Sequence, residues 1–135
     1  MKNIFLRRSY LVMLLCASII FNSCKKSPSS ANITGKWNMI RLYDKSNATN
    51  PSSQFRTGSY IDISSNSMYA YYAEGTDPFE SVTITYSRDN DKLNIAADEY
   101  WKITKVTSSD LIFDCYDVNT TSGASTYYGT LDLKK

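Results

Sequence analysis

Hydrophobic and polar residues alternate with a period of two along most of the chain after residue 33. Runs of this kind are separated by clusters of Ser, Asn and Asp, and no window keeps helical spacing over three turns. The alternation predicts eight strands, near residues 35–43, 58–64, 67–73, 80–87, 92–96, 99–107, 111–118 and 126–134. The pattern therefore indicates an all-β domain.

The connections between these strands predict how neighbouring strands pair. Residues 64–67, 89–91, 108–110 and 120–125 are rich in residues that close hairpins. Residues 44–56 are polar and contain Pro51, which predicts a long loop. Tight turns join antiparallel neighbours, so we expect a small antiparallel up-and-down barrel of about eight strands. The alternative is a two-sheet β-sandwich.

The alternation also predicts which residues face inward. Trp37, Met68, Trp101, Phe113 and Cys115 belong to the apolar set. The opposite, amphipathic face is expected to carry six tyrosines: Tyr60, Tyr69, Tyr71, Tyr100, Tyr116 and Tyr128. An eight-stranded barrel has room inside for side chains or for one small ligand, so a filled and a hollow interior both remain open.

The first 23 residues follow a different pattern. Lys2, Arg7 and Arg8 give a positive amino end, residues 10–21 carry no charge, and Ser23 precedes Cys24. This order is typical of a secretory signal, and twelve residues are too few for a membrane-spanning helix, which needs roughly 20. We predict a signal peptide over 1–23 that is removed, a tether over 24–32, and a β-domain over 33–135.

The segment that ends at Cys24 resembles the lipobox of bacterial lipoproteins, although Phe21 and Asn22 depart from the usual residues. The resemblance implies that Cys24 receives diacylglycerol and palmitate and anchors the chain to a membrane. Because Lys25 and Lys26 follow in place of an acidic run, we expect a periplasm-facing domain on the outer membrane. The alternative is ordinary secretion with a free thiol at this position.

The start of the first predicted strand resembles a second family. Gly35-Lys36-Trp37 is similar to the Gly-x-Trp opening of lipocalins, and residues 100–114 resemble the second half of the lipocalin-like domains found in small bacterial lipoproteins. The resemblance implies a barrel whose end is closed by Trp37 and that binds a small amphipathic or apolar ligand. One departure is that the last strand carries only Lys134 and Lys135 where larger lipocalins place an Arg.

Charge and composition exclude several function classes. Removal of the signal leaves twelve basic against thirteen acidic residues, a formal net charge of −1, without the clustered basic residues that nucleic acids require. The chain contains no His, which removes the usual base for Ser or Cys nucleophiles. Cys115 is predicted to be buried, and residues 89–91 lack the Gly and Glu of a calcium loop. We expect no enzyme activity, no cofactor and no metal site.

Tyrosine is the one compositional excess, with ten of the eleven after Cys24. We expect Tyr72 and Tyr86, beside residues 75–79, and Tyr43, beside the 44–56 loop, to lie near the open mouth of the barrel. Their hydroxyls would orient the polar end of a ligand, or the rings would simply cap the core. The alternative function is a non-catalytic envelope interaction module or inhibitor that uses the Tyr-rich outer face.

Overall fold

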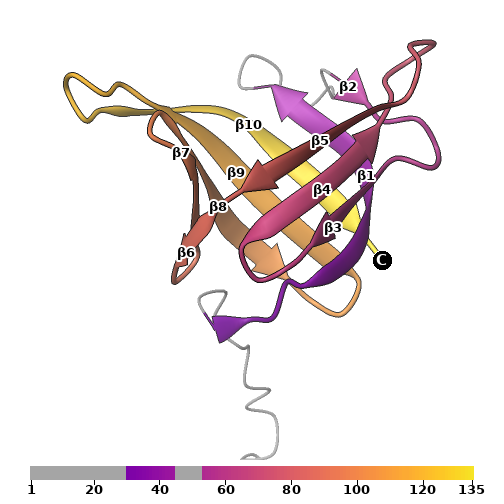
Figure 1. Ribbon diagram of the computed structural model, residues 1–135, viewed down its shortest axis with the longest axis horizontal. Coiled ribbons are helices and arrows are strands. Elements are labelled where there is room, and N and C mark those ends of the chain that lie inside the picture. Colours follow the sequence, from indigo (N-terminus) through magenta and orange to yellow (C-terminus); the bar gives the residue numbers. More distant parts are fainter. Residues whose placement is uncertain (1–29, 45–52) are drawn as a thin grey trace, which may run out of the picture.

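The computed structural model describes residues 30–44 and 53–135, which form ten strands and no long helix (Figure 1). The strands are β1 (Gly35–Asp44), β2 (Ser53–Gln54), β3 (Tyr60–Ile63), β4 (Ser67–Tyr72), β5 (Glu80–Thr85), β6 (Ser87–Asp89), β7 (Lys92–Ala96), β8 (Glu99–Val106), β9 (Asp110–Val118) and β10 (Ser125–Lys134). Cys24 and the predicted signal and tether lie outside the described residues, apart from 30–32. Within the described ranges no helix is long and apolar enough to span a bilayer.

All ten strands belong to one antiparallel sheet with the order β5-β4-β3-β1-β10-β9-β8-β7-β6, and β2 pairs only with β1. The two ends of this path, β5 and β6, are separated in the chain by Tyr86 alone. The sheet therefore curves round until its ends meet on one bent stretch of chain, which Figure 1 shows below the β5 arrow. No hydrogen-bonded ladder closes the sheet between β5 and β7.

The all-β prediction is confirmed, and a single sheet forms in place of two. Eight strands result when β5 and β6 are counted as one bent strand and the two-residue β2 is set aside. The sequence pattern missed β2 because it falls in the predicted 44–56 loop. There it pairs with Arg41 and Leu42 of β1, so the part of this loop that the structure describes is partly strand.

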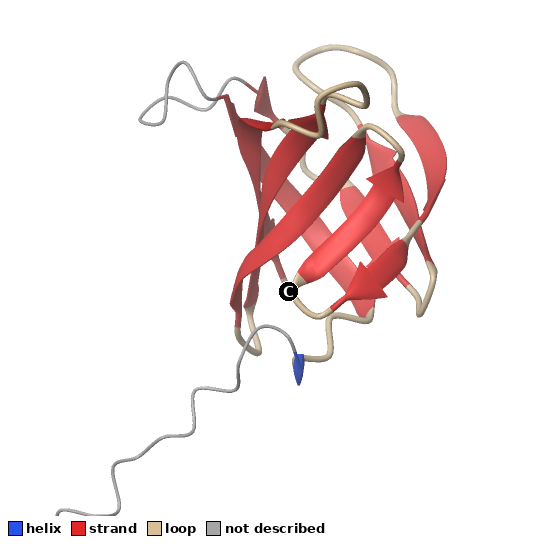
Figure 2. Cartoon of the chain, turned by 90° about the vertical axis from the view of Figure 1, so that its left-hand side faces the viewer, coloured by secondary structure: helices blue, strands red, loops and turns tan. Residues whose placement is uncertain are grey.

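The barrel has two ends that differ in their connections (Figure 2). At the lower end the chain enters at Gly35 and leaves at Lys134, and residues 64–66 and 107–109 form tight turns. At the upper end lie residues 73–79, 97–98 and 119–124. We call the two parts of the interior that lie next to these ends the lower half and the upper half.

The lower half is filled by side chains. Four of these side chains are 0% exposed: Met68, Leu111, Phe113 and Leu133. Four further buried residues pack with them: Ile33, Ile63, Leu93 and Ile103. Trp37, 1% exposed, donates a hydrogen bond from Nε1 to the carbonyl oxygen of Ile33 at 2.8 Å. Lys135 Nζ lies 4.6 Å from the centre of the Trp37 ring. Trp37 thus closes the lower end, with a lysine across its ring.

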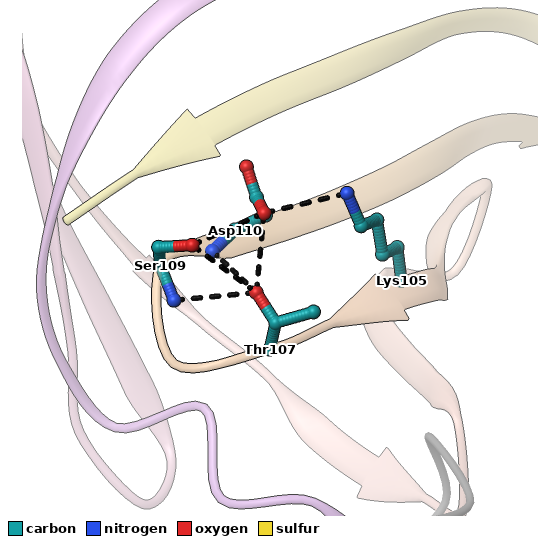
Figure 3. Close-up of polar contacts among 4 residues, drawn as sticks. All are labelled: Lys105, Thr107, Ser109 and Asp110. Carbon is teal, nitrogen blue, oxygen red and sulfur yellow. Dashed lines mark hydrogen bonds and ion pairs between the residues drawn. The ribbon is translucent and has the colours of Figure 1, made fainter. Parts of the chain in front are cut away.

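The β8–β9 turn shows how polar residues fix a hairpin at the lower end (Figure 3). Asp110 Oδ2 accepts hydrogen bonds from Thr107 Oγ1 and Ser109 Oγ, both at 3.2 Å, and forms an ion pair with Lys105 Nζ at 3.3 Å. The bond from Lys105 is the largest of the causes that lower the pKa of Asp110. Thr107 and Asp110 also close the turn through a backbone hydrogen bond.

The outer face carries two rows of aromatic rings. In the first, Tyr60 contacts Tyr71, Tyr71 stacks on Phe79 at 4.7 Å, and Lys36 and Arg56 cover the two ends. In the second, Tyr100 stacks on Tyr116 at 4.8 Å, Tyr116 meets Tyr127, and Lys92 covers Tyr100. Five of the six tyrosines predicted for the outer face follow this pattern, including Tyr69, which is 41% exposed and contacts Tyr60.

Candidate functional site

The upper half of the barrel contains a cavity of about 260 Å³. Its wall is built mainly from aliphatic side chains on four strands: Met39, Leu42, Ile61, Val82, Ile84 and Leu131. These residues alternate with outward-facing polar ones, so the strand period that fills the lower half leaves a hydrophobic hollow in the upper half. A hollow of this size and polarity suits a small apolar molecule.

One wall of the cavity carries a polar group of three residues. Trp101 and Tyr128 line the cavity, and both donate hydrogen bonds to Oε1 of Glu99. The distances are 2.7 Å from Trp101 Nε1 and 2.6 Å from Tyr128 OH. Glu99 shares its parity on β8 with Trp101 and Ile103, so its side chain belongs to the inward face. The two aromatic donors hold the carboxylate in a fixed position beside the hollow.

Burial keeps the thiol of Cys115 and the hydroxyl of Tyr128 neutral. Desolvation raises the pKa of the Cys115 thiol to about 12, with smaller contributions from nearby charges. Desolvation is also the largest cause that raises the pKa of Tyr128, and electrostatic coupling to Cys115 and the hydrogen bond to Glu99 raise it further. At neutral pH Cys115 is therefore a thiol and not a thiolate nucleophile, as its predicted burial implied.

The cavity reaches solvent through the barrel wall at β5. Val82 faces inward, because it is paired with buried Ala70, and both residues line the cavity. Val82 is nevertheless 42% exposed. The reason is that β5 has a hydrogen-bonded neighbour, β4, on one side only. The interruption of the sheet between β5 and β7 thus gives an opening beside the cavity.

The three tyrosines predicted as ligand contacts lie in three different places. Tyr72 lines the cavity and meets the ring of Phe55 edge-on at 6.1 Å. Tyr86 lies at the far end of β5 from residues 75–79, in the packed lower half, where its hydroxyl donates a hydrogen bond to the carbonyl oxygen of Ser64 at 2.5 Å. Tyr43 lies on the outer face, under the guanidinium of Arg41 at 4.7 Å.

The misplacement of Tyr43 has a physical cause in β1. A bulge between Met39 and Arg41 inserts one residue, and it reverses the side to which the following side chains point. After the bulge Leu42 faces the cavity, and Arg41 lies outside, where it pairs with Asp132 at 3.1 Å. Tyr43 follows the parity of Arg41.

A second bulge, between Tyr127 and Gly129 of β10, places Tyr128 inside the barrel. The sequence prediction that Tyr128 lies on the outer face is therefore wrong. A Cβ atom at Gly129 would lie 2.6 Å from the carbonyl oxygen of Tyr43, so the close approach of β1 and β10 at this point requires glycine.

The sequence analysis missed one residue of the candidate site, Glu99. The signal that could have identified it is a charged residue at an inward position of β8.

A second, polar hollow adjoins the cavity and shares Tyr72 and Glu74 with it. Asp77 and Glu80 also line this hollow. No group of three or more His, Cys, Asp or Glu residues within 30–44 and 53–135 has the arrangement of a metal site. Residues 89–91 form a hairpin turn with Asn90 at a φ of 56°, as their sequence predicted.

Comparisons with known proteins find similarity to solved structures only. No family model and no curated protein matches the chain. A dog lipocalin allergen is 20% identical over 78% of this chain and 74% of its own, with a TM-score of 0.46. Bovine odorant binding protein, solved in complex with undecanal, is 16% identical over the same shares with a TM-score of 0.45.

Proposed function

We propose that this chain is a membrane-anchored lipoprotein of the cell envelope, whose barrel binds one small apolar or amphipathic molecule in its upper half. The observation that carries the ligand-binding proposal is the cavity of about 260 Å³ with an apolar lining, a few fixed polar groups and an opening at β5. This combination of an apolar wall and a small number of oriented polar side chains is the usual construction of a small-molecule site.

The anchoring proposal rests on the sequence around Cys24 and agrees with the geometry of the barrel. The described chain enters the barrel at Gly35, at the lower end, whereas the cavity lies in the upper half. A lipid on Cys24 would therefore hold the filled end towards the outer membrane and leave the cavity accessible from the periplasm. Acyl anchoring of this kind is stable when more than one chain is attached.

A non-enzymatic role fits the chemistry of the cavity. The chain has no His, and the pKa of Cys115 is raised, so the cavity has neither an imidazole base nor a thiolate. Tyr72, Tyr128 and the Glu99 group are suited to orient a ligand through hydrogen bonds. We propose that Tyr72 contacts the ligand, while Tyr86 and Tyr43 serve packing within the core and on the outer face.

Native mass spectrometry tests the binding proposal directly. Residues 25–135, which contain the whole sheet, are purified from the natural host and measured under non-denaturing and denaturing conditions. We expect an added mass of one small molecule that is lost on denaturation and is absent from Ala70→Leu, a variant that fills the cavity. A chain without added mass that also fails to bind alkyl alcohols would contradict the proposal.

The anchor is tested separately by Cys24→Ser. Lipid attachment needs the thiol, so we expect this variant to keep its signal segment and to lose the mass of the attached lipid. Maturation to the same size, with unchanged partition into membranes, would contradict the lipoprotein proposal.

A further inference from the structure

We propose that the cavity selects apolar molecules that end in a cation or a hydrogen-bond donor, of which primary alkylamines are the simplest, over molecules that end in a carboxylate. This inference rests on the proposed function and names its ligand class. It follows from the charges that the cavity presents and from the groups that fix them in place.

The carboxylate of Glu99 is the central observation. Oε1 accepts hydrogen bonds from Trp101 Nε1 and Tyr128 OH, two side chains that line the cavity. Within residues 30–44 and 53–135, Glu99 has no ion pair, and Oε2 has no hydrogen-bond partner. The Glu99 carboxylate is thus held directly behind two lining side chains, and its Oε2 keeps its acceptor capacity.

Cations are absent from the described lining of the cavity. Three cations of the barrel have partners on its outer face. Arg41 pairs with Asp132, Arg56 lies over Phe79, and Lys92 lies over Tyr100. Among the described lining the charged residue is Glu74, which is acidic, and Glu99 lies behind the lining residues Trp101 and Tyr128. A ligand carboxylate would therefore enter a site with one acidic side chain in its described lining, a second one directly behind that lining, and no cation.

The apolar surroundings of the cavity strengthen the attraction of its acidic side chains for a cationic ligand and their repulsion of an anionic one. An ion pair or a charge repulsion is weakly screened where few water molecules separate the charges. A bound alkylammonium would give Glu99 the partner that it lacks, whereas a bound carboxylate would place two like charges side by side. The hydroxyls of Tyr72 and Tyr128 can serve either ligand, so they do not reverse the preference.

Three ligands with the same eight-carbon chain test the inference: octylamine, octan-1-ol and octanoate. Their dissociation constants for residues 25–135 are measured by calorimetry at neutral pH, where the amine is protonated and the acid is ionised. We expect octylamine to bind most tightly and octanoate about tenfold more weakly, which is a difference of about 1.4 kcal/mol. The alcohol, which keeps the apolar contacts and has no charge, should lie between them.

Glu99→Gln removes the charge and keeps an oxygen that accepts hydrogen bonds from Trp101 and Tyr128. In this variant we expect the amine and the carboxylate to bind with affinities within about threefold of each other, which is less than 1 kcal/mol apart. The matched control is Asp98→Asn, which removes a neighbouring exposed charge in the β7–β8 turn and should keep the original order. Tyr128→Phe removes one donor but leaves the Glu99 charge, so the amine preference should persist.

The outcomes separate this inference from the function on which it rests. If octan-1-ol binds the cavity but octanoate binds as tightly as octylamine, the selectivity is wrong and ligand binding stands. The selectivity is also wrong if Glu99→Gln retains the full amine preference while Asp98→Asn loses it. If none of the three molecules binds, both the selectivity and the proposed function are contradicted.

Discussion

The lower and upper halves of this barrel are built from the same strands, yet one is filled and the other is hollow. In the lower half, large side chains meet from opposite walls, and Trp37 closes the end. In the upper half, the inward positions lie around an open space, and the sheet is interrupted between β5 and β7. The comparison teaches that the two halves of one barrel can have different roles. The filled lower half stabilises the fold, and this allows a cavity to persist in the upper half.

The largest expected effect is the loss of the side chain that closes the lower half. Trp37→Ala removes a ring that is 1% exposed, together with its hydrogen bond to Ile33 and its contact with Lys135. We expect the free energy of unfolding to fall by about 3–5 kcal/mol, as measured by urea denaturation. An unchanged denaturation midpoint would show that the lower half does not carry the stability of the domain.

Two leucines on β10 sharpen the comparison, since they have the same side chain, strand and face. Leu133 is 0% exposed in the lower half, and Leu131 is 4% exposed but lines the cavity. We expect Leu133→Ala to cost an amount near the top of the range of about 2–5 kcal/mol, and Leu131→Ala an amount near its bottom, because the side chain of Leu131 already borders empty space. Equal losses in urea denaturation would contradict the division into two halves.

Added volume should have opposite consequences in the two halves. Ile63→Phe enlarges a side chain that is 2% exposed in the filled half, and we expect a loss of about 1–3 kcal/mol in the free energy of unfolding. Ala70→Leu enlarges a side chain that faces the cavity, so we expect stability to stay the same or to rise by up to about 1 kcal/mol. Binding of octan-1-ol should disappear in Ala70→Leu. If both variants are destabilised alike, the upper half is as tightly packed as the lower.

The smallest expected effect separates two tyrosines by their hydroxyl groups. Tyr86→Phe removes the hydrogen bond to Ser64 in the lower half and should lower the free energy of unfolding by about 0.5–1.5 kcal/mol. Tyr72→Phe should leave stability unchanged and weaken the binding of octan-1-ol. The reverse result, with binding sensitive to Tyr86 and stability sensitive to Tyr72, would place the ligand in the lower half and contradict the proposed site.

Much of the fold could be predicted from the sequence because alternation reports burial directly. The inward positions of Met68, Trp101 and Phe113, and the burial of Cys115, follow from a period of two. The turns were recognisable for an equally local reason. Asn and Asp side chains bond to nearby backbone groups, as Asn119 does with the amides of Thr121 and Ser122.

The candidate site could be predicted only in part, because it depends on departures from that period. The bulges in β1 and β10 each add one residue, and they move Tyr43 outward and Tyr128 inward. The alternation of hydrophobic and polar residues in the sequence does not reveal either bulge. Tyr86 was placed at the wrong end because parity gives the face of a strand and not the height along it. A strand rises by roughly 3.3 Å per residue, so Tyr86 lies about 20 Å from the start of β5.

The central claim is that a small apolar molecule binds in the upper half and leaves the lower half unchanged. Methyl NMR spectra of residues 25–135, recorded during a titration with octan-1-ol, test this claim most directly. We predict saturable shifts of the methyl signals of Met39, Ala70 and Leu131, which line the cavity, with little change at Met68, Leu111 and Leu133. Shifts confined to the second group, or no saturable shift in either group, would contradict the account.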